Sequence, residues 1–288
     1  MKRKIVILLV VFIIGVISYK VVVAKDTLNV LVYGLESTRS DSMMLIMMDE
    51  SNNQVNVITI PRDTYNPAEG HDGQGTKKLN AVYGFKNDGG TSGLIKSIES
   101  IVGVDIDRYI EVKYDGVKAI TDLVGGVPVN VPYDMDYDDT FSSPPLHIHI
   151  NQGEQVLEGD QVIEYLRFRK SNDGTINEGD IQRIDRQQDF LMAAAGKVLS
   201  WKLPFVVKKA LSKVETDITT LDIGNFGFGM IGARQENVFF HVLPQERIGR
   251  GKDGLSYFFH SPEKTAQLIE DIKNDVFTIQ EDEDIVNK

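Results

Sequence analysis

The chain is 288 residues long, with 42% hydrophobic and 25% charged residues, which are ordinary fractions for a folded protein and exclude a largely disordered or collagen-like chain. Lys and Arg number 31 against 42 Asp and Glu, so the formal net charge is −11, and this excess of negative charge argues against a nucleic-acid partner. The chain has no cysteine, which excludes disulfide frameworks, zinc–thiolate sites, iron–sulfur clusters and thiol nucleophiles.

The N-terminus combines a basic start with a long apolar stretch. Residues 1–4 include three basic side chains, and residues 5–24 are predominantly apolar, with Lys20 near the distal end. About 20 residues, rising 1.5 Å each, can cross ~30 Å of hydrocarbon. We therefore expect 5–24 to be a transmembrane anchor, with 1–4 in the cytoplasm by the positive-inside rule and the remainder outside.

A cleaved signal peptide is the alternative for this stretch, because Val22 and Ala24 resemble a small-residue cleavage site. Both interpretations export the rest of the chain. We expect that exported part to be one domain over residues 25–279, followed by an acidic tail at 280–288.

Hydrophobic periodicity predicts alternating strands and helices along the exported part. In chain order these are strands at 28–33, 42–48 and 55–60, helices at 79–85 and 93–102, a strand at 109–112, a helix at 117–123, a strand at 127–131, helices at 159–166 and 180–200, a strand at 238–242 and a helix at 263–273. Residues 132–145, rich in Asp, Ser, Tyr and Pro, predict an exposed loop. Short unbroken apolar strands indicate an α/β fold, with a central β-sheet covered by helices on both faces.

Six arginines lie in short polar motifs within apolar surroundings. The four motifs are 38–41, 60–63, 166–169 and 180–188. In an extended segment Arg167 and Arg169 would share a side, and on a helix Arg183 and Gln187 share a face. Because guanidinium groups grip phosphate oxygens in pairs, such a cluster in an acidic chain indicates an anionic ligand, most simply a pyrophosphate. The alternative is a set of surface ion pairs, since every motif has an Asp in or near it.

These motifs resemble those of the LytR–CpsA–Psr family of Gram-positive cell-envelope proteins. The resemblance covers roughly residues 28–200. Besides the N-terminal anchor, it rests on the strand ending at Gly34 with an acid soon after, and on the segments 39–41, 60–64, 78–81, 123–127, 165–169 and 179–188.

The resemblance implies an extracytoplasmic phosphotransferase beside the membrane lipid. It would move an anionic glycopolymer, such as wall teichoic acid or capsule, from a polyprenyl-pyrophosphate carrier to a peptidoglycan sugar hydroxyl. The implied catalytic residues are Asp41, Arg39 and Glu36, with Mg²⁺ as cofactor held by Asp41 and Glu36. Glu36 stands where the family usually has Asp, so its role as metal ligand or general base stays open.

The resemblance also implies a pyrophosphate cradle. Its members are Arg39, Arg62, Arg167, Arg169, Arg183, Arg186 and Gln187. Phosphoryl transfer depends on positioning and on neutralising charge, which arginines and a divalent cation supply. An apolar groove for the polyprenyl tail would be lined by Met43, Met44, Met47, Met48, Phe190, Leu191, Ala194 and Val198.

Two other functions use the same residues differently. A hydrolase of polyprenyl pyrophosphate would have water as the acceptor, and a non-enzymatic envelope regulator, as an older transcriptional attenuator label of the family suggests, would need no chemistry at all. Separately, His147 and His149 would lie on one side of a strand as a zinc pair, but the sequence offers no third ligand nearby.

Overall fold

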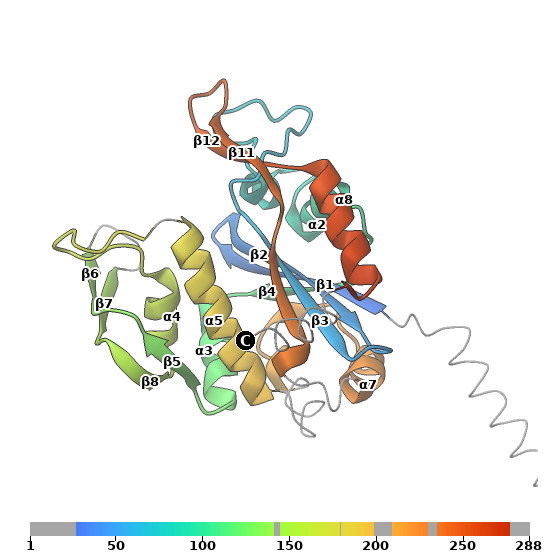
Figure 1. Cartoon of the computed structure of the whole chain (residues 1–288). Helices are drawn as coiled ribbons and strands as arrows, with labels where there is room; N and C mark the ends of the chain where they lie inside the picture. Colours follow the sequence, from blue (N-terminus) through green and yellow to red (C-terminus); the bar gives the residue numbers. More distant parts are fainter. Residues whose placement is uncertain (1–26, 141–144, 179, 199–208, 230–234, 277–288) are drawn as a thin grey trace, which may run out of the picture.

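The computed structural model describes residues 27–140, 145–178, 180–198, 209–229 and 235–276 (Figure 1). Its centre is a six-stranded sheet with the strand order β10-β3-β2-β1-β4-β9. These strands are β1 (Thr27–Glu36), β2 (Arg39–Asp49), β3 (Gln54–Ile60), β4 (Arg108–Val112), β9 (Glu215–Thr216) and β10 (Val238–Val242). The chain therefore has the mixed α/β fold with a central sheet that its apolar runs predict.

The direction of the strands brings several strand ends to one edge of the sheet. β1, β2 and β3 are successively antiparallel, whereas β4 pairs parallel to β1 and β10 pairs parallel to β3. The carboxyl ends of β1, β3, β4 and β10 consequently lie together, and we call this the carboxyl edge. Open α/β sheets build their ligand sites at such an edge.

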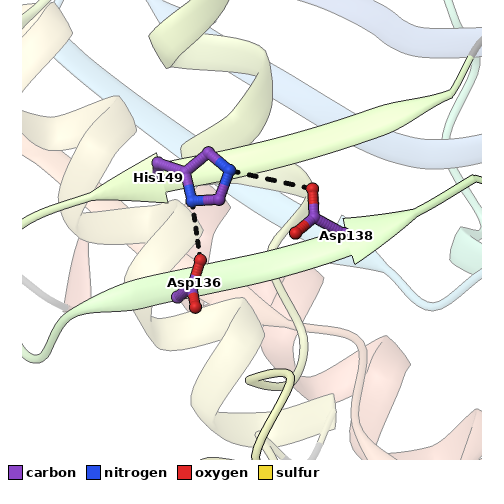
Figure 2. Close-up of side chains that lie close together, drawn as sticks. All are labelled: Asp136, Asp138 and His149. Atoms are coloured by element: carbon purple, nitrogen blue, oxygen red, sulfur yellow. Dashed lines mark ion pairs between the residues drawn. The ribbon is translucent and has the colours of Figure 1, made fainter.

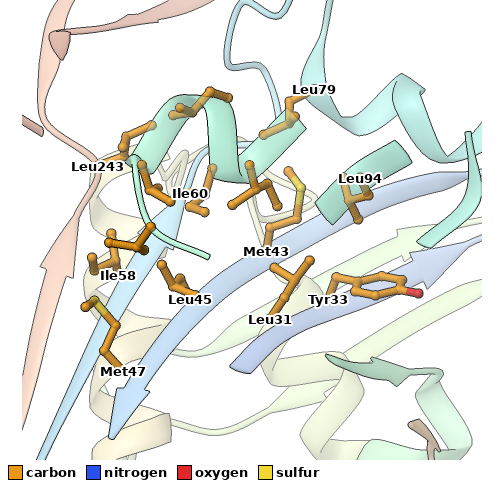
Figure 3. Packing of buried hydrophobic residues seen from close by; sticks show 14 of the residues in the cluster. Leu31, Tyr33, Met43, Leu45, Met47, Ile58, Ile60, Leu79, Leu94 and Leu243 are labelled. Carbon is orange, nitrogen blue, oxygen red and sulfur yellow. The ribbon is translucent and has the colours of Figure 1, made fainter. Parts of the chain in front are cut away.

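The main core lies between one face of the sheet and the helices η1 (Leu79–Gly84), α2 (Gly90–Val102) and α8 (Pro262–Lys273), as Figure 3 shows in part. Alternate residues of β2 point into this core because side chains along a strand alternate between its faces. Met43 and Met47, expected to line a groove, are only 1% and 8% exposed and belong to this core. Met44 and Met48 are half-buried on the opposite face.

A second core lies outside the central sheet, in a region that we call the second lobe. It is built from α3 (Tyr114–Leu123), α4 (Asp160–Arg167) and α5 (Asp180–Val198) with the two-stranded sheets β5–β8 and β6–β7. The four strands are β5 (Val127–Val131), β6 (Met135–Asp139), β7 (Leu146–Ile150) and β8 (Gly153–Leu157). Phe190, another residue of the expected groove, is 3% exposed in this second core.

The loop predicted over 132–145 is wrong where β6 forms. Aspartate is unfavourable in strands by propensity. Met135, however, is buried in the second core and Tyr137 packs against it, while Asp136 and Asp138 on the other face are exposed. Tertiary packing of the alternate residues therefore overrides the local preference.

The last part of the described chain adds short elements at the periphery. They are α7 (Thr220–Gly229), η2 (Gln235–Asn237) and a hairpin of β11 (Gln245–Arg250) with β12 (Ser256–His260). The expected anchor at 5–24 and the expected tail at 280–288 lie outside the described residues. Within the ranges that the structure describes, no helix has both the length and the apolar character needed to cross a membrane.

Candidate functional site

The tip of the β1–β2 hairpin carries three of the predicted site residues. Glu36 pairs with Arg39 across a two-residue turn in which Ser37 has a φ of 57°. The register shifts near this end, so that Asp41 alone in β2 has no Cα partner on β1. Such a bulge bends the strand and re-aims a side chain. The hairpin thus presents both carboxylates and one guanidinium at the carboxyl edge.

The hairpin tip is seated closely against η1. A Cβ atom on Gly84, at the end of η1, would lie 3.0 Å from the carbonyl oxygen of Thr38. A larger residue would therefore push the turn away. The small residue at position 84 lets η1 approach the tip and place its polar residues beside Asp41.

Asp41 is the centre of a first group of contacts. Its Oδ1 accepts hydrogen bonds from Nη1 of Arg62 at 3.0 Å and from Nδ2 of Asn80 at 3.3 Å. The Oδ1 of Asn80 in turn accepts a hydrogen bond from Nη1 of Arg39 at 3.2 Å. Arg62 therefore contacts Asp41 directly, and Arg39 is connected to Asp41 through the amide of Asn80.

Arg62 reaches this group because it lies just past the end of β3, after Pro61, in a segment bonded to η1. The backbone amide of Asn80 donates to the carbonyl oxygen of Arg62 at 3.1 Å, which joins the two segments. Asp63, the next residue, lies 2.9 Å from Nζ of Lys78 and 4.0 Å from Nε of Arg62. The carboxylate of Asp63 thus lies between two cations, Lys78 and Arg62, just past the end of β3.

Glu36 is the centre of a second group of contacts. Its Oε2 accepts a hydrogen bond from the hydroxyl of Tyr114 at 3.1 Å, and its Oε1 lies 3.8 Å from Nη2 of Arg167. The guanidinium carbon of Arg167 lies 5.2 Å from the centre of the Tyr114 ring, within the range of a cation–π contact. Tyr114 begins α3, with only Lys113 between it and the end of β4, so this group also sits at the carboxyl edge.

The hydroxyl of Tyr114 is held in its neutral form. Burial raises the pKa of Tyr114 to about 12, and the negative charges of Glu36 and Asp41 add to this effect, while Arg167 opposes it. The phenol therefore keeps its proton at neutral pH and donates a hydrogen bond to Glu36.

Arg167 does not lie in an extended segment. It is the last residue of α4, and Phe168 after it leaves the helix with φ −56° and ψ 139°. The prediction that Arg167 and Arg169 share a side of a strand is therefore wrong, because the helix runs one residue beyond the expected end at 166. Arg167 is half-buried over Tyr114, and Arg169 is exposed.

Arg183 and Gln187 lie on α5, as expected, and both are half-buried. The Nε2 of Gln187 donates to the carbonyl oxygen of Leu166 at 3.1 Å, which fastens α5 to the end of α4. The assignment of Arg169, Arg183 and Gln187 to a pyrophosphate site stays a prediction.

Arg186 has different surroundings from the other arginines of the motifs. Its side chain is 5% exposed and forms a paired contact with Glu178, with both nitrogen–oxygen distances at 2.7 Å. It also donates to the carbonyl oxygens of Tyr165 and Phe168, the latter at 2.8 Å. These bonds tie α5 to α4 and to the segment before α5.

Two residues of the site carried no predicted role. Asn80 lies in the matched segment 78–81, and its position between Asp41 and Arg39 depends on the packing of η1 against the hairpin. Tyr114 is 78 residues from Glu36 in the chain, and no local pattern signals it. Its only sequence signal is its place directly after a predicted strand.

The Arg62–Asp41 and Arg167–Glu36 ion pairs remain open to solvent. The side chains of Arg62 and Asp41 are 34% and 29% exposed, and those of Arg167 and Glu36 are 23% and 45% exposed. Exposed pairs of this kind contribute little to stability, ~0–1 kcal/mol. Their guanidinium groups can therefore exchange a carboxylate for a phosphate oxygen at small cost, and the carboxylates can take a cation.

Comparison with known proteins yields a consistent set of relatives. The model of the LytR_cpsA_psr family matches residues 15–274. Polyisoprenyl-teichoic acid–peptidoglycan teichoic acid transferase TagV of Bacillus subtilis is 31% identical over 67% of this chain, which spans half of that relative's length. TagU of Oceanobacillus iheyensis, named for the same transfer, is 28% identical over 86% of this chain and 76% of its own. The crystal structure of B. subtilis TagV superposes with a TM-score of 0.69 at 27% identity, over 86% of this chain and 97% of that one.

Proposed function

Because this chain belongs to the LytR–CpsA–Psr family, we propose that it is a phosphotransferase that attaches an anionic glycopolymer to peptidoglycan. The names of its relatives as teichoic acid transferases support this activity. The observation that carries the proposal is the cluster at the carboxyl edge, where Arg62 pairs with Asp41, Arg167 pairs with Glu36, and Arg39 is joined to Asp41 through Asn80. The donor is a polyprenyl-pyrophosphate-linked glycopolymer, and the acceptor is a sugar hydroxyl of peptidoglycan.

The proposed reaction is a displacement at the phosphorus that bears the glycopolymer. The acceptor oxygen forms a bond to this phosphorus while the bond to the bridging oxygen breaks. Polyprenyl phosphate leaves with that oxygen, and the proton of the acceptor hydroxyl passes to a base. Glu36 is a candidate for this base, since its carboxylate stands at the tip of the hairpin and its side chain is 45% exposed.

The chain's own residues would act on the charge of the pyrophosphate. Arg39, Arg62 and Arg167 would exchange their present partners for phosphate oxygens and stabilise the charge that develops on the leaving group. Arg169, Arg183 and Gln187 would extend the cradle from the second lobe. Arg186, enclosed by Glu178 and two carbonyl oxygens, would position α5 and not contact the ligand.

Magnesium fits the donor set at the hairpin tip. Asp41 and Glu36 provide oxygen donors only, and within the described ranges no third Asp, Glu or His joins them in a cluster. Mg²⁺ commonly takes one or two carboxylates and completes its shell with water and substrate phosphates. Asp41 and Glu36 would hold the ion, which when bound neutralises charge on the pyrophosphate.

We place the reaction outside the cytoplasmic membrane, at the lipid surface. The basic residues 1–4 and the apolar stretch 5–24 support an anchored domain with a cytoplasmic N-terminus. Met44 and Met48, half-buried on the face of the sheet away from the main core, are candidates from the expected groove for contact with the polyprenyl chain.

Transfer and hydrolysis are separated by the acceptor. We expect the full chain with Mg²⁺ and a labelled lipid-linked glycopolymer to place label on peptidoglycan, and to release little free glycopolymer phosphate when peptidoglycan is omitted. The measurement is the label that sediments with peptidoglycan against the label that stays soluble. Equal release of soluble glycopolymer phosphate with and without peptidoglycan would instead identify the chain as a hydrolase. No reaction in either case would favour a non-enzymatic protein that only binds the lipid-linked glycopolymer.

Replacement of Asp41 tests the magnesium proposal. Asp41→Asn removes a charged ligand but keeps the size of the side chain. We expect the Mg²⁺ concentration for half-maximal transfer to rise by roughly 10- to 100-fold or more. Loss of a residue that only supports a metal ligand already lowers metal affinity by roughly that factor. The matched control is Asp63→Asn, which removes the neighbouring carboxylate that also lies near Arg62. An unchanged magnesium requirement in Asp41→Asn, or an equal rise in both variants, would remove Asp41 from the metal site.

A further inference from the structure

The hairpin of β6 and β7 presents two aspartates and two histidines on a single face. Its antiparallel register places Asp136 directly opposite His149, and Asp138 directly opposite His147. Residues two apart on a strand share a face, so all four side chains project to the solvent side. On the other face, Met135, Ile148 and Ile150 are buried in the second core and hold the hairpin in place.

The ligating atoms of this face lie close together. The Nδ1 of His149 is 2.6 Å from Oδ1 of Asp136, and its Nε2 is 3.7 Å from Oδ1 of Asp138, so the ring stands between the two carboxylates (Figure 2). One ligand atom from each of Asp136, Asp138 and His149 fits within 4.8 Å of the others. The Nδ1 of His147 is 2.5 Å from the same Oδ1 of Asp138.

Asp138 is fixed from outside this group of side chains. The amide of Asn172 donates to Oδ2 of Asp138 at 3.2 Å, and the carbonyl oxygen of the same amide accepts the backbone N–H of Asp138 at 2.9 Å. The backbone N–H of Asn172 also donates to the carbonyl oxygen of Asp136 at 2.8 Å. The loop after α4 therefore holds this strand and leaves Oδ1 of Asp138 directed at the histidines.

We propose that Asp136, Asp138 and His149 form a binding site for a divalent transition-metal ion of the zinc type, with His147 orienting Asp138. One imidazole and two carboxylates are ligands that zinc accepts, and three protein ligands leave a position for water or another group. The imidazole makes the set less suited to Mg²⁺, which prefers oxygen donors. The site shares no residue with the proposed magnesium site and pins the two strands of a hairpin together.

The competing explanation of this cluster is that its histidines and aspartates form ordinary surface ion pairs and bind no metal. His71 and Asp88 supply an example within the same chain, with Nε2 of His71 3.0 Å from Oδ1 of Asp88 and the ring stacked on Phe85. That pair has one carboxylate, and the described residues offer it no third ligand. His71→Gln is therefore the matched control for His149→Gln, because both changes remove a histidine paired with an aspartate.

The test is a calorimetric titration of the full chain, without a polyhistidine tag, with zinc chloride. The protein is first freed of metal by a chelator and dialysed into excess Mg²⁺, so that the proposed magnesium site is saturated. We expect one zinc ion to bind per chain. His149→Gln and Asp136→Asn should each weaken binding by roughly tenfold or more, a loss like that seen when other metal sites are altered. His71→Gln should bind as the parent does.

Thermal unfolding provides a second readout. Zinc should raise the midpoint of unfolding of the parent and of His71→Gln, because the folded state alone assembles the site. It should raise the midpoint less in His149→Gln and in Asp136→Asn. Both of these side chains are exposed, so the variants should fold, which the far-UV circular dichroism of metal-free protein checks. Zinc affinity in both variants equal to that of the parent overturns the proposal.

Discussion

Arg62→Lys and Arg167→Lys should each slow transfer of the glycopolymer by roughly ten- to a hundredfold. A lysine keeps the positive charge but lacks the planar fork that makes paired contacts with phosphate oxygens. Loss of one charge-assisted hydrogen bond in a partly buried site costs about 1.5–3 kcal/mol, which corresponds to that change in rate. The rate of label transfer to peptidoglycan at saturating Mg²⁺ measures the effect. Thermal stability should stay close to that of the parent, because exposed ion pairs contribute little to it.

Arg108→Lys is the matched control for these two variants. The Nε of Arg108 lies 2.8 Å from Oδ2 of Asp222, and its side chain is 33% exposed, against 34% for Arg62. Arg108 begins β4 and so lies at the opposite edge of the sheet from the site. Its replacement should leave the transfer rate within about twofold of the parent's, because Arg108 lies away from the site. Stability should also change little, since an exposed ion pair contributes only ~0–1 kcal/mol to it. Parental rates in both Arg62→Lys and Arg167→Lys would overturn the arginine cradle.

Arg186→Leu should destabilise the protein strongly. The change leaves the carboxylate of Glu178, whose side chain is 3% exposed, without its cation, and it removes the hydrogen bonds that Arg186 donates to two carbonyl oxygens. Removal of one partner of a buried ion pair costs about 3–5 kcal/mol. In a chain of this size, the midpoint of thermal unfolding moves by roughly 2–4 °C per kcal/mol, so we expect a fall of ~6–20 °C. Differential scanning calorimetry measures it.

Lys197→Ala is the control for this effect, because Lys197 is an exposed cation on the same helix. Surface changes of that kind stay within about 0.5 kcal/mol. A small change in the unfolding midpoint of Arg186→Leu, together with a loss of transfer rate like that in Arg62→Lys, would indicate that Arg186 contacts the pyrophosphate. A large fall in stability would make it the residue that holds α5 in place.

The sequence by itself determined the local elements and the residue types of the site. The strands expected at 127–131 and 238–242 occur with those bounds, and the helix expected at 93–102 is found as Gly90–Val102. Periodicity of apolar residues is a local property, so a window of a few turns is enough to reveal it. The family motifs likewise brought Asp41 and Arg62 into one prediction, and the two are in contact.

Only the tertiary structure decided which residues of a motif are buried in ion pairs and which are open to the site. Arg183 and Arg186 lie three residues apart on α5, yet Arg183 is half-buried, whereas Arg186 is 5% exposed and paired with Glu178 from the segment before the helix. Tyr114 enters the site from the turn after β4, and the parallel pairing of β4 with β1 brings it to Glu36. No pattern within either segment carries this information, because burial and charge partners depend on distant parts of the chain.

The metal site proposed on β6 and β7 shows the same division. His147 and His149 were visible in the sequence as a pair on one side of a strand, and they lacked a third ligand there. Asp136 and Asp138 complete the set, but they stand in a segment whose composition predicts a loop. Strand register is what joins the two pairs. Register is set by the burial of alternate residues against a core, and that core is assembled from helices and strands that lie far apart in the chain.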